Sequence, residues 1–255
     1  MARTGKPAVR HVAAVERGLG VLEVLAEAGG ELGTNELARR ARLNPSTVSR
    51  LLATLSAAGY VDHVEDTGRY RLGVRLIQLG NIVLAGLDVR EAARQHLEAL
   101  VVETGETATL SVPGGRDAVT VDFVQSASSV QSVARLGRPS VAHATAAGKV
   151  LLAFGDVALP TGRLERFTPH TITDHRRLAS AVERARAQGW AEAAGERERD
   201  LDALAAPSFA ADRRLAAILG LQGPEGRFDR RARRVALGPL LARARALSEA
   251  LGWRP

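Results

Sequence analysis

The sequence predicts an α+β fold in two parts: a small N-terminal domain of three helices and a β-hairpin, and a larger domain of interleaved helices and strands. Three observations lead to this prediction. Apolar residues near the N-terminus recur at helical spacing between turn residues. Two short alternating segments around a glycine-containing loop follow them. The rest of the 255-residue chain, long enough for two small domains, alternates between strand-like and helix-like segments.

The first expected helix carries one apolar stripe and ends at Gly29-Gly30. The stripe residues recur every three or four positions: Val12, Val15, Leu19, Leu22 and Leu25. Thr34 is expected to cap a second, short helix, because threonine is a favoured N-cap residue. The inner face of that helix is Leu37, Ala38 and Ala41.

A third helix is expected after Asn44, a favoured N-cap, with Pro45 in its first turn and Gly59 just past its end. Its buried face is Val48, Leu51, Leu52 and Leu55. Its outward face holds short polar or small side chains and one arginine, with no acid: Ser46, Thr47, Ser49, Arg50, Ala53 and Thr54.

Two short strands, Tyr60–Val64 and Arg69–Leu72, complete a winged helix-turn-helix, in which the third helix enters the DNA major groove. Arg50 can reach a guanine or a phosphate, and Arg69 and Arg71 of the wing would lie along the DNA backbone. The candidate DNA-binding residues are Thr34, Asn44, Ser46, Thr47, Ser49, Arg50 and Arg69. The alternative is a winged helix that serves only protein–protein interaction.

A further helix from Gly73 to about Leu87 has an apolar side formed by Leu76, Leu79 and Val83, together with Leu87. This stripe has no obvious partner in a small winged helix. We therefore expect the helix to connect two domains or two subunits.

The C-terminal half alternates between helices and strands around one expected sheet. The expected helices are Ala93–Val101, Thr145–Phe154, Leu178–Gln188 and a segment from Asp229 onward. The expected strands are Ala108–Val112, Val119–Phe123, Gln131–Leu136, Trp190–Glu192 and Leu215–Gln222. Pro239 is expected to kink the last helix or to start a new one.

The net charge of +7 and a pI near 10.9 are typical of a protein with a polyanionic partner. Most of this charge lies in residues 213–255, which hold ten Lys/Arg and three Asp/Glu. A basic tail of this kind is more often a solvated face than a nucleic-acid site. The local pattern is more informative, because four arginines and no acid lie between Arg39 and Tyr60.

Composition excludes several classes of protein. The chain has no cysteine, which excludes disulfides, zinc–thiolate sites and cysteine nucleophiles and fits a cytoplasmic protein. No run of 18 apolar residues occurs, and the N-terminal residues lack the pattern of a signal peptide, so no membrane segment is expected.

Motifs for catalysis, metals and cofactors are not found. Gly148-Lys149 resembles the end of a phosphate-binding loop, but His143 and Val150 stand where that loop needs glycine and serine or threonine. His170 and His175 are read as parts of a polar loop in preference to a metal pair. The acids at Glu196, Glu198, Asp200 and Asp202 alternate with arginines, which predicts a charged, exposed segment, with paired-carboxylate catalysis as the alternative.

The chain resembles the IclR family of bacterial transcription regulators over nearly its full length. The N-terminal motifs that carry the resemblance are Val15–Leu19, Glu36–Ala38, Ser46–Leu55, Gly59–Val61 and Gly68–Gly73. The C-terminal motifs are Thr104–Thr107, Gly137–Pro139, His143–Ala153, Thr171–Asp174, Arg186–Trp190, Gly195-Glu196, Ala205–Pro207 and Gly223-Pro224.

This resemblance implies a winged-helix DNA-binding domain (residues 8–72), a linker helix (73–88) and a GAF-like α/β domain (89–255) for effector binding and oligomerisation. It implies a homodimer or homotetramer that binds an inverted-repeat operator and a small organic effector. The effector site carried over by motif comprises Ala146, Ala147, Leu201, Ala203, Gly220 and Gln222. Some family members hold a carboxylate with cysteine, aspartate or serine along these stretches, and Gln222 is the clearest polar candidate here.

The physical argument for this pocket is that the small residues leave room for a ligand. Gln222 and the N–H groups that begin the Thr145–Phe154 helix supply polarity, and the N–H groups favour an anion such as a carboxylate. The alternative is that these small residues only allow a helix and a strand to pack closely. Two other functions also remain open: an enzyme or metabolite-binding protein whose winged helix serves assembly, and an architectural DNA-binding protein without a ligand.

Overall fold

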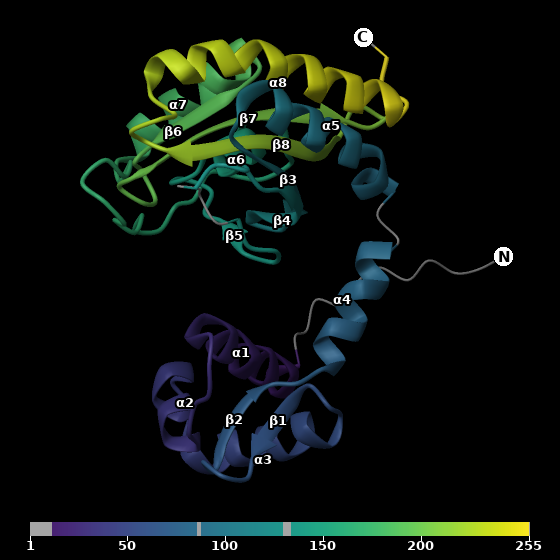
Figure 1. The fold of residues 1–255 in the computed structure, drawn as a ribbon. Helices are drawn as coiled ribbons and strands as arrows, with labels where there is room; N and C mark the ends of the chain where they lie inside the picture. Colours follow the sequence, from purple (N-terminus) through teal and green to yellow (C-terminus); the bar gives the residue numbers. More distant parts are fainter. Residues whose placement is uncertain (1–11, 86–87, 130–133, 255) are drawn as a thin grey trace, which may run out of the picture. The chain divides into compact units, whose positions relative to one another are not determined.

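The structure of the chain is a computed structural model, which describes residues 12–85, 88–129 and 134–254. The chain divides into two compact units, Met1–Gly86 and Leu87–Pro255, and each is described by itself (Figure 1).

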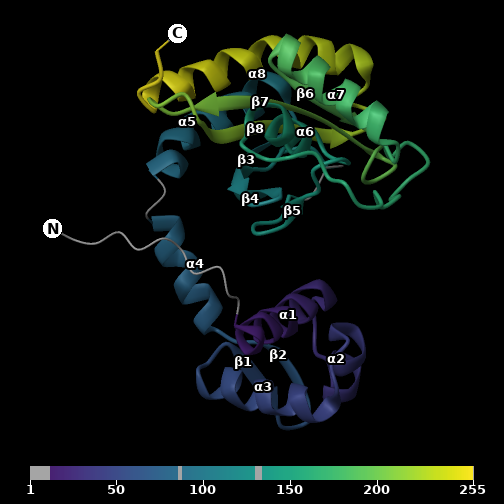
Figure 2. The same cartoon turned by 180° about the vertical axis from the view of Figure 1, so that it is seen from behind.

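The N-terminal unit consists of three helices, a two-stranded hairpin and a fourth helix (Figure 2). The helices are α1 (Ala13–Ala28), α2 (Thr34–Ala41), α3 (Pro45–Ala57) and α4 (Arg75–Ala85), and the antiparallel strands are β1 (Val61–Val64) and β2 (Arg69–Leu72). Local signals set the helix ends. Gly29 ends α1 in the left-handed conformation at φ 62°, and Gly59 follows α3 at φ 76°. A bridge from Leu32 to Tyr70 ties the α1–α2 connection to the hairpin.

The face of α1 that is buried in this unit differs from the apolar stripe expected from the sequence. Val12, Val15 and Leu19 are 63%, 58% and 55% exposed, whereas Gly18, Val21 and Leu25 are buried. The helix has apolar residues on two adjacent faces, so periodicity alone identified the wrong one over its first two turns. The α1 residues Val21 and Leu25 pack with Leu32, Leu37, Ala38, Val48, Leu52 and Val61.

The prediction for Thr34 is also wrong. Thr34 is the first residue of α2, and Gly33 occupies the N-cap position with no side chain to bond the helix. Glycine is acceptable there because it adopts the required backbone geometry at little cost.

The C-terminal unit contains one six-stranded sheet in which every neighbouring pair is antiparallel. The strand order is β5-β4-β3-β8-β7-β6, and the strands are β3 (Thr107–Gly114), β4 (Asp117–Val124), β5 (Pro139–Ser140), β6 (Ala191–Ala194), β7 (Leu201–Phe209) and β8 (Leu215–Pro224). The helices are α5 (Asp88–Thr104), α6 (Ala146–Phe154), α7 (His175–Gln188) and α8 (Arg230–Ala250).

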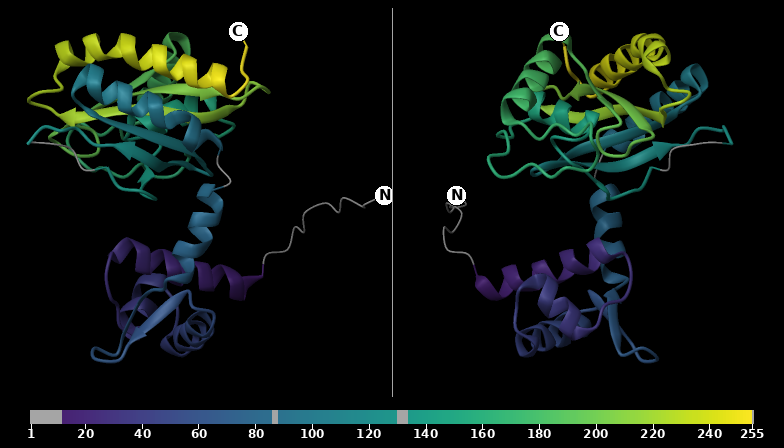
Figure 3. Two further views of the ribbon diagram at one scale, coloured as in Figure 1. Left: turned by 45° about the vertical axis from the view of Figure 1, so that its right-hand side comes forward. Right: turned by 90° about the vertical axis from the view of Figure 1, so that its left-hand side faces the viewer.

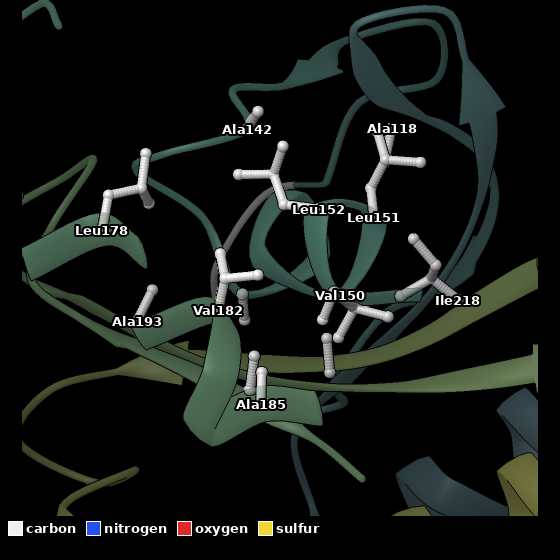
Figure 4. Close-up of a cluster of buried hydrophobic side chains, with 14 of the residues drawn as sticks. Ala118, Ala142, Val150, Leu151, Leu152, Leu178, Val182, Ala185, Ala193 and Ile218 are labelled. Carbon is white, nitrogen blue, oxygen red and sulfur yellow. The ribbon is translucent and has the colours of Figure 1, made fainter. Parts of the chain in front are cut away.

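Different helices pack on the two faces of this sheet. Helices α5 and α8 lie together against one face (Figure 3), where the Ser208 hydroxyl of β7 donates to the Ala244 carbonyl of α8 at 2.9 Å. Helices α6 and α7 pack on the other face, where Val150, Leu151, Leu178 and Val182 form a hydrophobic cluster with alanines of β6 and β7 (Figure 4). Alternate β7 residues therefore face different helices, as the period of a strand requires.

Two expected C-terminal elements differ from the structure. Of the expected strand Gln131–Leu136, residues 131–133 lie outside the described residues, and the remainder is not a strand. The sheet edge is β5 instead, two residues long and paired with Ala118 and Val119. Of the two outcomes expected at Pro239, a kink or a new helix, the new helix is wrong, because α8 runs from Arg230 to Ala250 as one element that includes Pro239. Proline leaves the carbonyl four residues earlier without its helix bond, and Val235 at that position is 72% exposed, so water can satisfy it.

Among the described residues, no helix combines the length and apolarity needed to cross a membrane.

Candidate DNA-binding surface and ligand cavity

The first turn of α3 is organised by Asn44. Its side-chain oxygen accepts the Thr47 backbone N–H at 2.8 Å and the Ser46 hydroxyl at 3.0 Å. The cap therefore fixes the start of α3, as expected, and it engages the side chain of Ser46 but only the backbone of Thr47. Ser49 and Arg50, one turn further on, are exposed.

Arg50 differs from Arg39 and Arg40, two arginines that precede it in the sequence. Arg39 and Arg40 of α2 both bind Glu36, with shortest N–O distances of 2.6 Å, and their hydrogen bonds lower the pKa of Glu36 to about 2. Arg50 has no acidic partner among the described residues. Its guanidinium is therefore available to an external anion.

Thr34 and Arg69 lie close together although 35 positions separate them in the sequence. Both line a shallow hollow between the start of α2 and the hairpin, together with Leu32, Gly33, Asn35 and Glu36. The wing is braced there, because the Thr67 hydroxyl donates to Glu31 at 3.0 Å. The structure thus brings the candidate residues of the wing and of α2 to one side of the hairpin.

A cavity of about 670 Å³ lies on the α6 side of the C-terminal sheet. All six residues carried over by motif line it: Ala146, Ala147, Leu201, Ala203, Gly220 and Gln222. Its floor follows the sheet register. Ala193 pairs with Ala203 and Ala203 with Gln222, so two small side chains and the Gln222 amide form one row across three strands.

The next row of the floor depends on Gly220. Gly220 pairs with Ala205 on one side and with Thr109 on the other. A Cβ atom at position 220 would lie 2.5 Å from the Thr109 hydroxyl oxygen. The glycine thus leaves room for a buried hydroxyl, and Ser111 and Thr120 contribute two more hydroxyls to the cavity wall. These three residues were not singled out from the sequence, although strand periodicity places 109 and 111 on the same face.

The start of α6 forms another wall. The Thr145 hydroxyl accepts the Gly148 N–H at 2.9 Å, and a Cβ atom at 148 would lie 2.6 Å from the Ala142 Cα. Glycine at 148 therefore permits the close approach that places Ala146 and Ala147 at the cavity.

The expectation of an exposed acidic segment is wrong at its first and last acids, Glu196 and Asp202, which are both buried. Glu196 is buried, and its carboxylate accepts a hydrogen bond from the Lys149 ammonium at 2.6 Å. Lys149 also donates to the Glu192 carbonyl at 2.8 Å. Burial raises the pKa of Glu196, although the Lys149 charge acts in the opposite direction. Lys149, considered above only as part of a failed phosphate-loop motif, is therefore one half of a buried ion pair beside the cavity.

The basic tail also contains a buried ion pair. Arg233 of α8 is buried and binds Asp202 of β7. A solvated face therefore does not describe this residue. Among the described residues, no group of three or more metal-ligating side chains occurs, and His170 lies in the loop before α7.

Comparison with known proteins identifies the family. The family model described as bacterial transcriptional regulator IclR C-terminal matches residues 81–249, and the IclR helix-turn-helix domain matches residues 14–65. The chain belongs to the IclR family. It is accordingly a DNA-binding transcription regulator with a C-terminal effector-binding domain.

Relatives and solved structures agree with this assignment. The HTH-type transcriptional regulator XynR of Escherichia coli K12 is 33% identical over 95% of this chain and 98% of its own length. The repressor AllR of Salmonella typhi is 30% identical over 99% and 97%. The IclR transcriptional regulator of Alicyclobacillus acidocaldarius has a TM-score of 0.78 at 25% identity, over 95% of this chain and 100% of that chain. The Thermotoga maritima IclR has a TM-score of 0.65 at 27% identity, over the same shares.

Proposed function

We propose that two or four copies of this chain bind an inverted-repeat operator through α3, and that a small organic acid in the C-terminal cavity controls this binding. The single observation that best supports effector binding is the cavity of about 670 Å³, because all six residues carried over by motif line it. A volume in this range is typical of small-molecule sites.

The proposed DNA contacts are Ser46, Thr47, Ser49 and Arg50 on α3, with Thr34, Asn44 and Arg69 beside them. The exposure of Ser49 and Arg50 supports this assignment, as does the lack of an acidic partner for Arg50 in the part of the chain that the structure describes. The Asn44 cap supports an indirect role for Asn44 and Ser46, which hold the first turn of α3 in place.

Arg50→Ala tests the DNA contact, with Arg184→Ala as the matched control, an exposed arginine of α7 in the C-terminal unit. We expect Arg50→Ala to weaken operator binding by about 1–3 kcal/mol if it reads a base, with relaxed specificity at one position. A phosphate contact would instead weaken binding to all sequences and reduce the salt dependence. Unchanged affinity in a gel shift with Arg50→Ala would contradict the assignment of α3.

Self-association is supported by the apolar side chains left exposed on α1. Val12, Val15 and Leu19 form a strip that is more than half exposed. One winged helix contacts too few base pairs for genomic specificity, so a symmetric pair on an inverted repeat is the expected arrangement. A monomer in light scattering at micromolar concentration would contradict it.

The proposed effector contacts are Ala146, Ala147, Leu201, Ala203, Gly220 and Gln222. Small side chains give room, and the first N–H groups of α6 favour an anionic group. Ala147→Leu should fill the cavity and abolish the effector response while operator binding persists. If Ala147→Leu still responds normally to the effector, the ligand binds elsewhere.

A further inference from the structure

Arg197 is a half-buried arginine in the wall of the C-terminal cavity. It lies in the connection between β6 and β7, and its guanidinium carbon is 5.2 Å from the centre of the Phe167 ring. Its Nη1 atom is shielded from water and has no hydrogen-bond acceptor among the described residues. A guanidinium with a buried, unpaired N–H group is costly unless something else balances its charge.

Three of the acids around Arg197 are engaged elsewhere, and a fourth, Glu165, is exposed to solvent and forms no ion pair with Arg197 among the described residues. Glu196 binds Lys149, Glu198 binds Arg138 at 2.7 Å, and Asp117 accepts the Ala142 backbone N–H at 2.9 Å. Burial, followed by the positive charge of Arg138, lowers the pKa of Arg197. The described residues therefore hold a positive charge at the cavity without giving it a counter-ion of its own.

The aromatic contacts place this charge near the start of α6. Phe167, which lies under the guanidinium, is also stacked on His143 with ring centres 5.9 Å apart. His143 is two residues before Thr145, the N-cap of α6. The guanidinium and the first N–H groups of α6 thus lie at neighbouring parts of the cavity wall, and both favour negative charge.

We propose that Arg197 is the counter-charge for the acidic group of the effector. This inference rests on the proposed function of the cavity. The guanidinium presents a planar fork of N–H donors that matches the paired oxygens of a carboxylate or a phosphate ester. The occupant is a small molecule that carries such an oxyanion, and its remainder lies against the small side chains of the sheet.

The test compares the wild type with Arg197→Met, Arg197→Lys and the control Arg199→Met. Arg199 is an exposed arginine of the same cavity wall, so its variant removes the same charge. Thermal unfolding is followed by the fluorescence of Trp190 and Trp253, the only tryptophans, both in the C-terminal unit. Each protein is titrated with benzoate and phenyl phosphate, with neutral benzamide as the uncharged match.

We expect benzoate or phenyl phosphate to raise the unfolding temperature of the wild type and of Arg199→Met. The probe that gives the larger shift identifies the oxyanion as a carboxylate or a phosphate ester. Benzamide should have a smaller effect. Arg197→Met should weaken binding of the anionic probe by roughly 10- to 100-fold, in line with hydrogen bonds to a charged group. Arg197→Lys should retain part of the affinity, because it keeps the charge but lacks the fork.

Equal anion-induced shifts in the wild type and Arg197→Met would overturn the inference, and so would a wild type that both anions leave unshifted. A melting point that falls in Arg197→Met while its anion affinity is unchanged would assign Arg197 a packing role only, and this too would overturn it. Stabilisation by benzamide alone would also overturn the inference, but it would still support ligand binding in the cavity, the part of the proposed function on which the inference rests. Gel shifts of the same variants report whether DNA binding persists.

Discussion

Replacement of Lys149 by methionine should destabilise the C-terminal unit strongly. Lys149 is 4% exposed, and its ammonium donates both to the Glu196 carboxylate and to the Glu192 carbonyl. Methionine is apolar and of similar length, so it fills the space but leaves the Glu196 carboxylate buried without its counter-ion. Glu196 Oε2 has no partner among the described residues, so the Ala194 backbone would be left as the neighbouring group that favours the charged carboxylate.

The size of the effect follows from this geometry. Removing one partner of a buried ion pair costs about 3–5 kcal/mol, because the remaining charge stays buried and unpaired. Removing both charges is much less harmful, since the desolvation of the second group is no longer required. We therefore expect Lys149→Met to lose several times more stability than the double variant Lys149→Met/Glu196→Gln.

Urea unfolding followed by tryptophan fluorescence measures this effect, because Trp190 and Trp253 both lie in the C-terminal unit. The dependence on pH gives an independent check. Burial raises the pKa of Glu196, and loss of Lys149 removes the main opposing charge. Folded Glu196 then binds a proton more readily than unfolded Glu196, so the destabilisation should shrink as the pH falls from about 7 to about 5. A single variant as stable as the double variant, with no such pH dependence, would show that the pair is not buried as described.

Three further outcomes are expected. Burial, followed by the charge of Arg243, lowers the pKa of His96. As the pH falls, the unfolded chain therefore takes up a proton at His96 before the folded chain does, and stability should decrease below a pH of about 6.5. The variant His96→Leu should reduce this loss of stability, as measured by urea titrations at two pH values. Gly220→Ala should cost about 1–3 kcal/mol by overpacking against Thr109, and a combined Thr109→Ala change should recover much of it in the same assay, whereas additive losses would refute the contact. Asn44→Ala should cost the N-terminal unit about 0.5–2 kcal/mol through loss of the α3 cap, detectable by faster amide exchange at Thr47, and unchanged exchange would argue against the cap.

Local chemistry explains which elements could be predicted from the sequence. Asn44 and Pro45 mark the start of α3, and Thr145 marks the start of α6, because each of these signals acts within one helical turn. The same local reasoning is wrong for α1, where two adjacent apolar faces compete and only the contacts of the folded unit decide between them. It also overlooked Arg233, whose partner Asp202 lies on a distant strand.

The cavity shows the same limit at the level of single residues. Its small residues could be placed by family motif, but its charged wall depends on the turn at Gly195, which has a φ of 59°. The Thr168 hydroxyl donates to the Gly195 carbonyl at 2.6 Å, and the Thr171 hydroxyl donates to the Glu196 carbonyl at 2.6 Å. These bonds connect segments 25 or more residues apart, and they hold the backbone carbonyls of Gly195 and Glu196.

Alternation of acids and arginines along 196–202 favours an exposed segment only when the backbone is free to present both charges to water. Here the loop before α7 fixes the backbone. The charge of Glu196 therefore needs a cation close to it, and the charge of Arg197 needs an anion, because water cannot solvate either side chain fully. Lys149 supplies the first. The described residues do not supply an anion for Arg197, but an acidic ligand in the cavity that Arg197 lines would supply it. A charge pattern that resembles a solvated face can therefore encode a binding site when long-range hydrogen bonds decide which charges face inward.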